Sequence, residues 1–168
     1  MMKSLLVLLM LGAAVPAYAQ VPVTAAPDQA AQLQDKDPKL AANKKIVYDF
    51  LRIVLNASHV DQGDKFVDPG YIEHNAVIPT GRAALMKLFG KMPRKDIEST
   101  LPGLVAILAD GDLVTVVSVT NLDDPHEPGA KYTWSHFDMF RLKNGRIAEH
   151  WDDQKKDSPV PTGAPPPG

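Results

Sequence analysis

Residues Tyr132–Asp152 read YTWSHFDMFRLKNGRIAEHWD, and this stretch decides the fold. Its two halves read as strands, and Asn144-Gly145 between them is a strong signal for a tight turn. Both Trp residues and two of the five His residues of the chain fall inside it. We therefore predict a β-hairpin that carries an unusual number of ionisable and aromatic side chains.

Side chains along a strand alternate between its two faces. One face of the first predicted strand carries Tyr132, Trp134, His136, Asp138, Phe140 and Leu142. Such a mixture of large aromatic and titratable side chains is typical of a ligand pocket. In the second strand, one face carries Ala148, His150 and Asp152, and the other carries Ile147, Glu149 and Trp151.

The length of the turn decides which face of the second strand joins this pocket, because a slip of one residue moves every side chain to the opposite face. A two-residue turn at Asn144-Gly145 places Trp151 beside Asp138, whereas a three-residue turn at 143–145 places His150 opposite Asp138. We favour the three-residue turn because it gathers ionisable side chains into one cluster. Its members are the candidate catalytic residues His136, Asp138, His150 and Asp152.

A second segment of this kind is 71–75, Tyr-Ile-Glu-His-Asn, which follows a predicted turn at 68–70. As a strand it would place Tyr71, Glu73 and Asn75 on one face. The alternative interpretation is a wall strand whose polar residues only hold a loop by hydrogen bonds. The candidate substrate-pocket residues are Tyr71, His74, Asn75, Tyr132, Trp134, Phe140 and Trp151.

Helices are predicted ahead of the strands. Asp37-Pro38 is an N-cap followed by proline at the first helical position, and apolar residues at helical spacing continue the helix to about Asn56. A short helix is expected at 59–66, and a third at 81–92 with Thr80 as its cap. Further strands are expected at 98–109 and 113–121. Helices followed by a mostly antiparallel sheet indicate the α+β class, with a curved sheet wrapped on the long helix around a pocket.

The two ends of the chain read differently from its middle. Residues 1–19 combine a basic start, a short apolar run and Ala17-Tyr18-Ala19, which predicts a signal peptide cleaved after Ala19 and a secreted or periplasmic protein. Residues 20–35 are predicted to be a flexible leader, 36–154 the domain, and 155–168 a Pro-rich disordered tail.

Charge and composition exclude several classes of function. Without Lys3 the chain has 17 basic and 20 acidic residues and no basic stripe, so no nucleic-acid partner is expected. No membrane partner is expected once the signal peptide is removed. The chain has no Cys, which excludes disulfides and a thiol nucleophile.

Several of these motifs together resemble one known family. The Tyr71–Asn75 segment, Pro79-Thr-Gly-Arg82 at the start of a helix, and the closing stretch Phe137–Asp152 are similar to SnoaL-like relatives of polyketide cyclases. These belong to the nuclear-transport-factor-2-like superfamily. The resemblance implies a cone-shaped, curved antiparallel sheet closed by helices around a pocket, and a homodimer through the sheet.

The resemblance also implies a chemistry. In the family's cyclases an Asp on the last strand acts as acid and base in an aldol condensation, and by position this role falls to Asp152. His136 or Asp138 would be its partner across the hairpin. No cofactor is needed for such a reaction. The expected ligand is a small apolar or aromatic molecule, and burial of a carboxylate in an apolar pocket raises its pKa.

Three functions remain open on the sequence: a cofactor-independent lyase or isomerase, a non-catalytic protein that binds a small molecule in the periplasm, and a structural or dimerisation module. Convergent His and Asp residues favour the enzyme. A metal site is the competing interpretation of the same residues, since His136-x-Asp138 and His150-x-Asp152 could supply two imidazoles and two carboxylates. No recognised metal-binding spacing is present, so we predict none.

Overall fold

A computed structural model describes residues 20–156. The predicted signal peptide, 1–19, lies outside the described residues, and so does the predicted tail from residue 157 onward. Among the residues described, no helix is both long and apolar enough to cross a membrane.

The long first helix is present as predicted, with one change along its length. The Asp37 side chain accepts a hydrogen bond from Lys39 N (2.8 Å), and α2 runs over Pro38–Asp49. The helix then continues as the π-helix η1, Phe50–Asn56. In a π-helix, residues about five apart come one turn apart, so Phe50 and Leu55 can face the same side.

Shorter helices complete the cover of the sheet. They are α1 (Gln29–Gln32), η2 (Val60–Gln62), α3 (Gly63–Phe66) and α4 (Arg82–Phe89). The prediction that Thr80 caps α4 is wrong, because the cap position is Gly81, with φ of 96° and no side-chain hydrogen bond. The Thr80 hydroxyl instead accepts a hydrogen bond from Glu73 N (3.0 Å), which ties the loop before α4 to the first strand.

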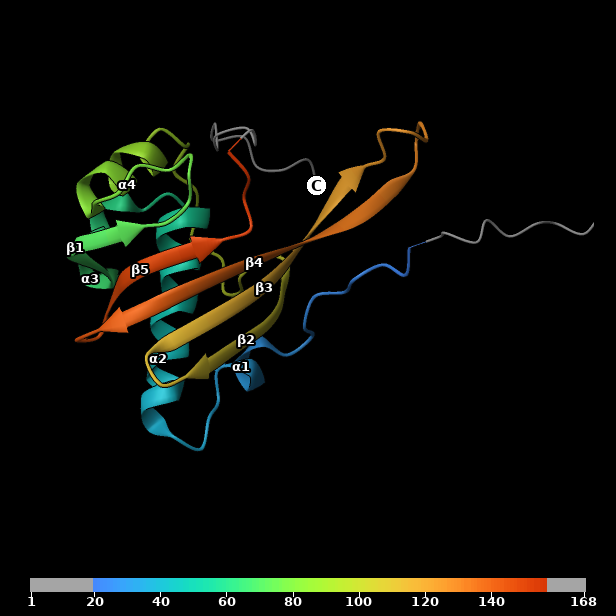
Figure 1. The fold of residues 1–168 in the computed structure, drawn as a ribbon. Helices are drawn as coiled ribbons and strands as arrows, with labels where there is room; N and C mark the ends of the chain where they lie inside the picture. The colour runs from blue at the N-terminus through green and yellow to red at the C-terminus, as the bar shows by residue number, and fades with distance from the viewer. Residues whose placement is uncertain (1–19, 157–168) are drawn as a thin grey trace, which may run out of the picture.

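Five strands form one sheet in the order β1-β5-β4-β3-β2. They are β1 (Val67–Glu73), β2 (Leu104–Asp110), β3 (Leu113–Asp123), β4 (Lys131–Lys143) and β5 (Arg146–Asp152). The neighbouring pairs are antiparallel except β1 and β5, which are parallel. Figure 1 shows α2 crossing one face of this curved sheet, with α3 and α4 beside β1. The predicted α+β class, with a curved sheet on N-terminal helices, is confirmed.

Two predicted boundaries change. The strand expected at 98–109 begins only at Leu104. The turn expected at 68–70 lies inside β1, where Asp68 Oδ1 accepts a hydrogen bond from Gly70 N (2.8 Å). This local turn is a bulge in the strand: Val67 pairs with Ile147 and Ile72 with Glu149, so β1 uses five residues where β5 uses two.

The hairpin register differs from the prediction. The turn has two residues, Asn144 and Gly145, both with positive φ (52° and 74°), and the three-residue turn is therefore wrong. A bulge then shifts the pairing between Arg141 and Leu142, where β5 has Ala148 as an extra residue. The predicted pairing of His150 with Asp138 is also wrong: Asp138 pairs with Asp152, and Phe140 pairs with His150. Because the bulge restores the face of Asp152, the predicted cluster still forms.

The segment predicted as a flexible leader lies against the domain. Ala26 N donates to Leu104 O (2.7 Å), and the Gln20 side chain bonds both the carbonyl (2.7 Å) and the amide (2.8 Å) of Thr133. Gln29 Oε1 accepts a hydrogen bond from the Tyr48 hydroxyl of α2 (2.7 Å). These contacts anchor 20–32 along the sheet, which its Ala- and Pro-rich composition did not indicate.

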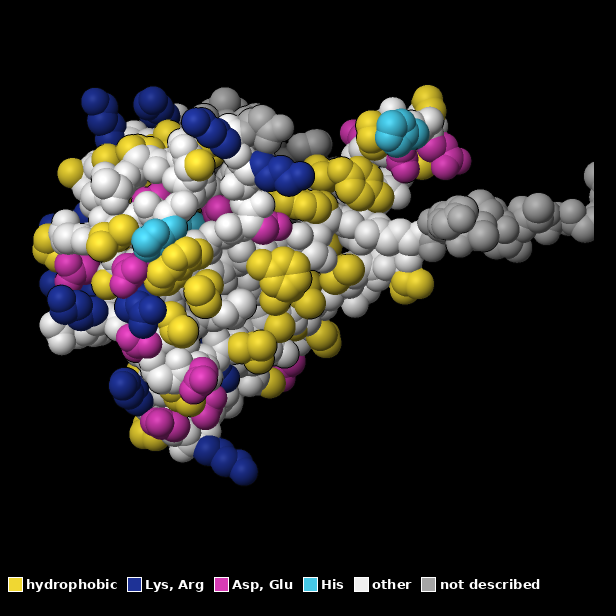
Figure 2. All heavy atoms as spheres, in the orientation of Figure 1, with side chains coloured by type: hydrophobic (Ala, Val, Ile, Leu, Met, Phe, Trp, Pro, Cys, Tyr) yellow, Lys and Arg dark blue, Asp and Glu magenta, His cyan; other side chains and the backbone are white. Residues whose placement is uncertain are grey.

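The two faces of the sheet have different surroundings. The core lies between the sheet and the helices, and Phe50, Val54, Val116, Phe140 and Ile147 are almost completely buried there. The opposite face is open, and Figure 2 shows hydrophobic side chains gathered on it. The exposed large hydrophobic residues include Ile72, Leu108 and Phe137. On the covered face the sheet and the helices enclose a cavity.

Candidate active site

A cavity of about 220 Å³ lies between the covered face of the sheet and the helices. Its helical and loop side is apolar, whereas its strand side is mostly polar. The apolar lining consists of Phe50, Leu51, Leu55, Ile78, Leu85, Phe89 and Phe140. The polar lining consists of Tyr71, Glu73, His136, Asp138, His150, Asp152 and Gln154. This division of the lining suits a small molecule with an apolar body and one polar end.

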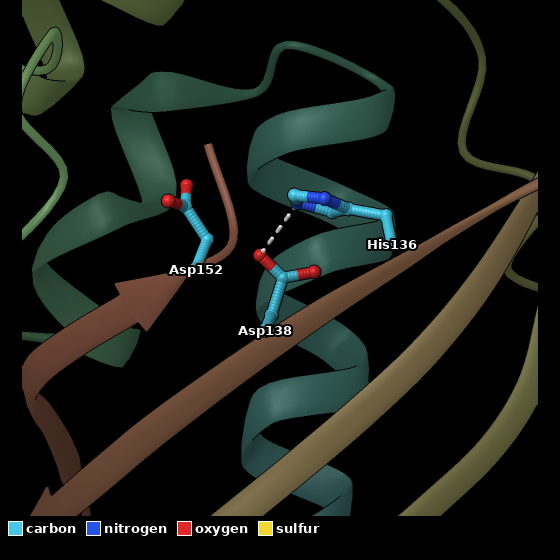
Figure 3. A group of neighbouring side chains, drawn as sticks. All are labelled: His136, Asp138 and Asp152. Carbon is cyan, nitrogen blue, oxygen red and sulfur yellow. Dashed lines mark ion pairs between the residues drawn. The ribbon is translucent and has the colours of Figure 1, made fainter. Parts of the chain in front are cut away.

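Strand register explains how the polar groups meet. Asp138 of β4 pairs with Asp152 of β5, and Glu73 of β1 pairs with His150. His136 lies two residues before Asp138 on the same face of β4. Figure 3 shows His136, Asp138 and Asp152 pointing toward one another from the two strands. Glu73 and His150, which are 77 residues apart, thus reach one wall of the cavity.

His150 lies at the centre of this wall, between two carboxylates. Its Nδ1 lies 2.9 Å from Glu73 Oε1, its Nε2 lies 3.0 Å from Asp138 Oδ1, and its ring stacks on Phe140 at 4.7 Å. Burial alone lowers the pKa of His150, but the hydrogen bonds to Asp138 and Glu73 outweigh it and raise that pKa to about 9. At neutral pH His150 is therefore an imidazolium, which donates from both nitrogens.

Glu73 is the most enclosed charge of the site, with a side chain only 1% exposed. Besides His150, its carboxylate accepts hydrogen bonds from the Tyr71 hydroxyl (2.5 Å) and Asn75 N (3.0 Å). Burial raises the pKa of Glu73, but the bonds to His150 and Tyr71 outweigh burial and hold the pKa below its ordinary value. The pKa of Tyr71 is raised by its burial and by the Glu73 charge, so the phenol stays protonated.

Asp138 is held between two imidazoles. Its Oδ1 lies 3.0 Å from His150 Nε2 and 3.3 Å from His136 Nε2. Burial favours the neutral acid, but the two imidazoles outweigh it and lower the pKa of Asp138. The pKa of His136 is lowered by burial and raised more strongly by Asp138, and its Nδ1 lies 2.5 Å from Asp153.

The carboxylate of Asp152 is held by hydrogen bonds from neutral donors. Its Oδ2 accepts a hydrogen bond from Asn75 Nδ2 (2.6 Å), and its Oδ1 accepts one from Gln154 N (3.1 Å). Both donors are neutral amides, which fix the carboxylate without neutralising it. Asn75, predicted to be a pocket residue, therefore acts from behind Asp152, and the structure does not place it in the cavity lining.

Besides Asn75, four more predicted pocket residues lie outside the cavity. Trp151 is on the open face of the sheet because it alternates with His150, and His74 stacks on it there (4.6 Å, 5°). Tyr132 and Trp134 share the face of His136 but precede it along β4, and Trp134 is 42% exposed. Figure 1 shows that this end of β4 projects with β3 beyond the helices, and neither residue lines the cavity.

Several residues that line the cavity were not among the predicted site residues. Glu73 could have been found, because it alternates with Tyr71 on a strand that was already predicted. The helical residues gave a weaker signal: Phe50, Leu51 and Leu55 read as ordinary core positions. Only their placement over the polar wall distinguishes them from the rest of the apolar face.

Three side chains of the site are of types that can bind a metal ion. His136, Asp138 and Asp152 each offer a ligand atom, and these atoms lie within 4.8 Å of one another. A metal-binding imidazole must be neutral and have one nitrogen free of other partners. Both nitrogens of His136 instead lie near carboxylates: Nε2 is 3.3 Å from Asp138, and Nδ1 is 2.5 Å from Asp153. These side chains fit an ion-pair cluster better than a metal site.

Comparison with known proteins gives one match of sequence and several of structure. The family model described as SnoaL-like domain matches residues 47–150. A search of curated proteins found no match. Among solved structures, an M. tuberculosis LEH-like epoxide hydrolase has 17% identity and a TM-score of 0.49, covering 68% of this chain and 84% of its own.

Two further solved structures are similar to the same extent. A candidate polyketide cyclase from Acidithiobacillus ferrooxidans has 22% identity and a TM-score of 0.47, covering 66% of this chain and 86% of its own. TsrD from Streptomyces laurentii has 17% identity and a TM-score of 0.47, covering 71% of this chain and 90% of its own. Likenesses this remote do not inform the reaction.

Proposed function

Because this chain belongs to the SnoaL-like family, we propose that it is a cofactor-independent lyase or isomerase acting on a small cyclic or aromatic carbonyl compound. One observation carries the proposal: an otherwise apolar cavity has Glu73, His136, Asp138, His150 and Asp152 on one wall. Burying that many ionisable groups is costly, and a pocket that only bound an apolar molecule would have little use for them.

Asp152 is the proposed proton acceptor. Its carboxylate lines the cavity and is fixed by two neutral donors, so it is oriented and still able to take a proton. It would break a C–H bond next to the substrate carbonyl, and the electron pair would pass to the carbonyl oxygen as an enolate. If the enolate carbon then attacks a second carbonyl, the new alkoxide takes the proton back from Asp152.

The imidazoles have a supporting role in this scheme. Neither nitrogen of His150 is free to accept a proton, so a direct role for it as base is not part of the proposal. His150 and His136 supply positive charge beside Asp138, and the same charges would stabilise an enolate that forms near them. Phe50, Phe89 and Phe140 would hold the flat body of the substrate.

The test does not require the natural substrate. Incorporation of deuterium from D₂O next to the carbonyl of cyclic and aromatic ketones would be followed by NMR, with and without protein. We expect acceleration by the wild type, and a loss of about 100-fold or more in Asp152→Asn, as for other general bases. The control is Asp123→Asn, which removes an exposed carboxylate paired with Lys131 and should exchange as the wild type does.

The other outcomes are informative. Exchange at the wild-type rate in Asp152→Asn would refute the role of Asp152. Saturable binding of the ketones with no exchange in any protein would favour the second candidate, a non-catalytic binding protein. That candidate rests on the apolar helical side of the cavity, which could hold a ligand without any proton transfer.

A further inference from the structure

The wall of the cavity contains a chain of hydrogen bonds in which Asp152, the proposed base, is not a member. It begins at the Tyr71 hydroxyl, passes to Glu73 (2.5 Å), then to His150 (2.9 Å), and ends at Asp138 (3.0 Å). Three strands contribute to it: β1, β5 and β4. All four of its members line the cavity.

Burying the Glu73 carboxylate costs free energy, because the charge loses its contact with water. A carboxylate that is 1% exposed has lost nearly all contact with water, and its charge must be balanced by hydrogen bonds and an opposite charge. It receives three hydrogen bonds, from Tyr71, His150 and Asn75 N. A Leu or Met would fill such a position more cheaply, so the charge itself is the feature to explain.

We infer that Glu73 is a positioning residue of the active site: by holding Nδ1 of His150 it turns Nε2 toward Asp138 and fixes that carboxylate beside Asp152. The geometry allows little else, because His150 has only two nitrogens and each faces one carboxylate. The catalytic consequence rests on the proposed function, whereas the effect of Glu73 on His150 does not.

The fixed imidazolium has a clear consequence for the two aspartates. Asp138 and Asp152 face each other across the strands, and two neighbouring carboxylates tend to share one proton. A positive charge on His150 across the neutral range lets Asp138 stay ionised, which leaves no proton for the pair to share. Asp152 then remains able to accept one from a substrate. Glu73 contributes by keeping His150 charged across the neutral range.

Few other charged groups can act on His150. The helices and the 77–81 loop contribute only apolar side chains to the cavity lining, so the titratable surroundings come from the strands and the residue after β5. They are Tyr71 and Glu73 on β1, His136 and Asp138 on β4, Asp152 on β5, and Asp153 through His136. Of these, only Glu73 and Asp138 bond His150 directly.

The experiment is an NMR titration of the five histidines, with the His150 signal assigned by its loss in His150→Gln. In the wild type we expect His150 to titrate near pH 9. In Glu73→Gln its pKa should fall by about one to three units, as expected when an adjacent opposite charge is removed. The matched control is Glu149→Gln, which removes the carboxylate next to His150 in sequence, on the open face, where it pairs with His74 (3.1 Å).

A second variant covers the case in which Glu73→Gln does not fold. Glu73→Asp keeps the charge but withdraws it by one methylene, so the His150 pKa should fall only part of the way. Circular dichroism would confirm that each protein is folded. An unchanged His150 titration in both Glu73 variants, or an equal shift in Glu149→Gln, would overturn the inference.

Deuterium exchange then separates this inference from the proposed function. A merely structural role for Glu73 predicts the same loss of exchange at every pH. A positioning role predicts that the upper pH limit of exchange, near pH 9 in the wild type, moves down with the His150 pKa. If His150 responds to Glu73→Gln but no protein catalyses exchange, the inference stands and the proposed function fails.

Discussion

The raised pKa of His150 makes a specific prediction about how stability depends on pH. Its pKa is 6.5 when unperturbed and about 9 in the fold, because Asp138 and Glu73 bind the protonated ring more strongly than burial opposes it. A shift of this size corresponds to about 3 kcal/mol of unfolding free energy. The His150 side chain is only 9% exposed, so water screens little of this contribution.

The sign follows from which state holds the proton. Below pH 6.5 the ring is protonated in both the folded and the unfolded chain, and the stabilisation is fully present. Between pH 6.5 and about 9 the unfolded chain loses the proton first, so the unfolding free energy falls as pH rises. His136 adds to the fall, because its pKa is also raised, whereas the lowered pKa values of Glu73 and Asp138 act only in acid.

Urea unfolding at half-unit steps from pH 6 to 10 would measure this dependence. We expect the unfolding free energy of the wild type to drop by about 3 kcal/mol across that range. Glu73→Gln should show a shallower drop, and His74→Gln, which removes a half-exposed histidine from the open face, should keep the full one. A wild-type curve that is flat from pH 6.5 to 9 would refute the reasoning.

Two further predictions concern the backbone and the core. Gly145→Ala should lower the unfolding free energy by about 1–2 kcal/mol in thermal melts, because φ of 74° is strained for alanine; the new Cβ itself would meet no other atom. Asn144→Gly, at φ of 52°, should be neutral or stabilising. A loss there as large as in Gly145→Ala would contradict the turn assignment. Phe50→Ala should lower the unfolding free energy by about 3–5 kcal/mol, since Phe50 is only 2% exposed. Phe137 is 51% exposed, so Phe137→Ala should lower it far less in the same urea titration. Equal losses would mean that Phe50 is not part of the core.

Much of the fold was predictable because its signals are local. Asp37-Pro38 marks the start of α2 by a side-chain hydrogen bond within the first turn, and alternation in β4 puts Asp138 and Phe140 on one face. Each of these features depends on residues at most a few positions apart. The Thr80 cap failed because a tertiary contact, the bond from Glu73 N, engages its hydroxyl instead.

The candidate site was predictable only in part. His136, Asp138, His150 and Asp152 line the cavity, as their alternation indicated, but alternation says nothing about where along a strand the helices provide cover. Trp134 lies on the correct face and still outside the cavity for that reason.

The sequence by itself determined which side chains share a face within each strand, because alternation is a property of the pleated backbone. Tertiary structure alone decided how the strands align. The bulge at Ala148 lets the observed two-residue turn coexist with a buried His150, a compromise between turn geometry and packing that no local pattern encodes. Pairing of β1 with β5 then brought Glu73 to His150. Because both side chains are buried there, the protonation state of each depends on the charge of the other.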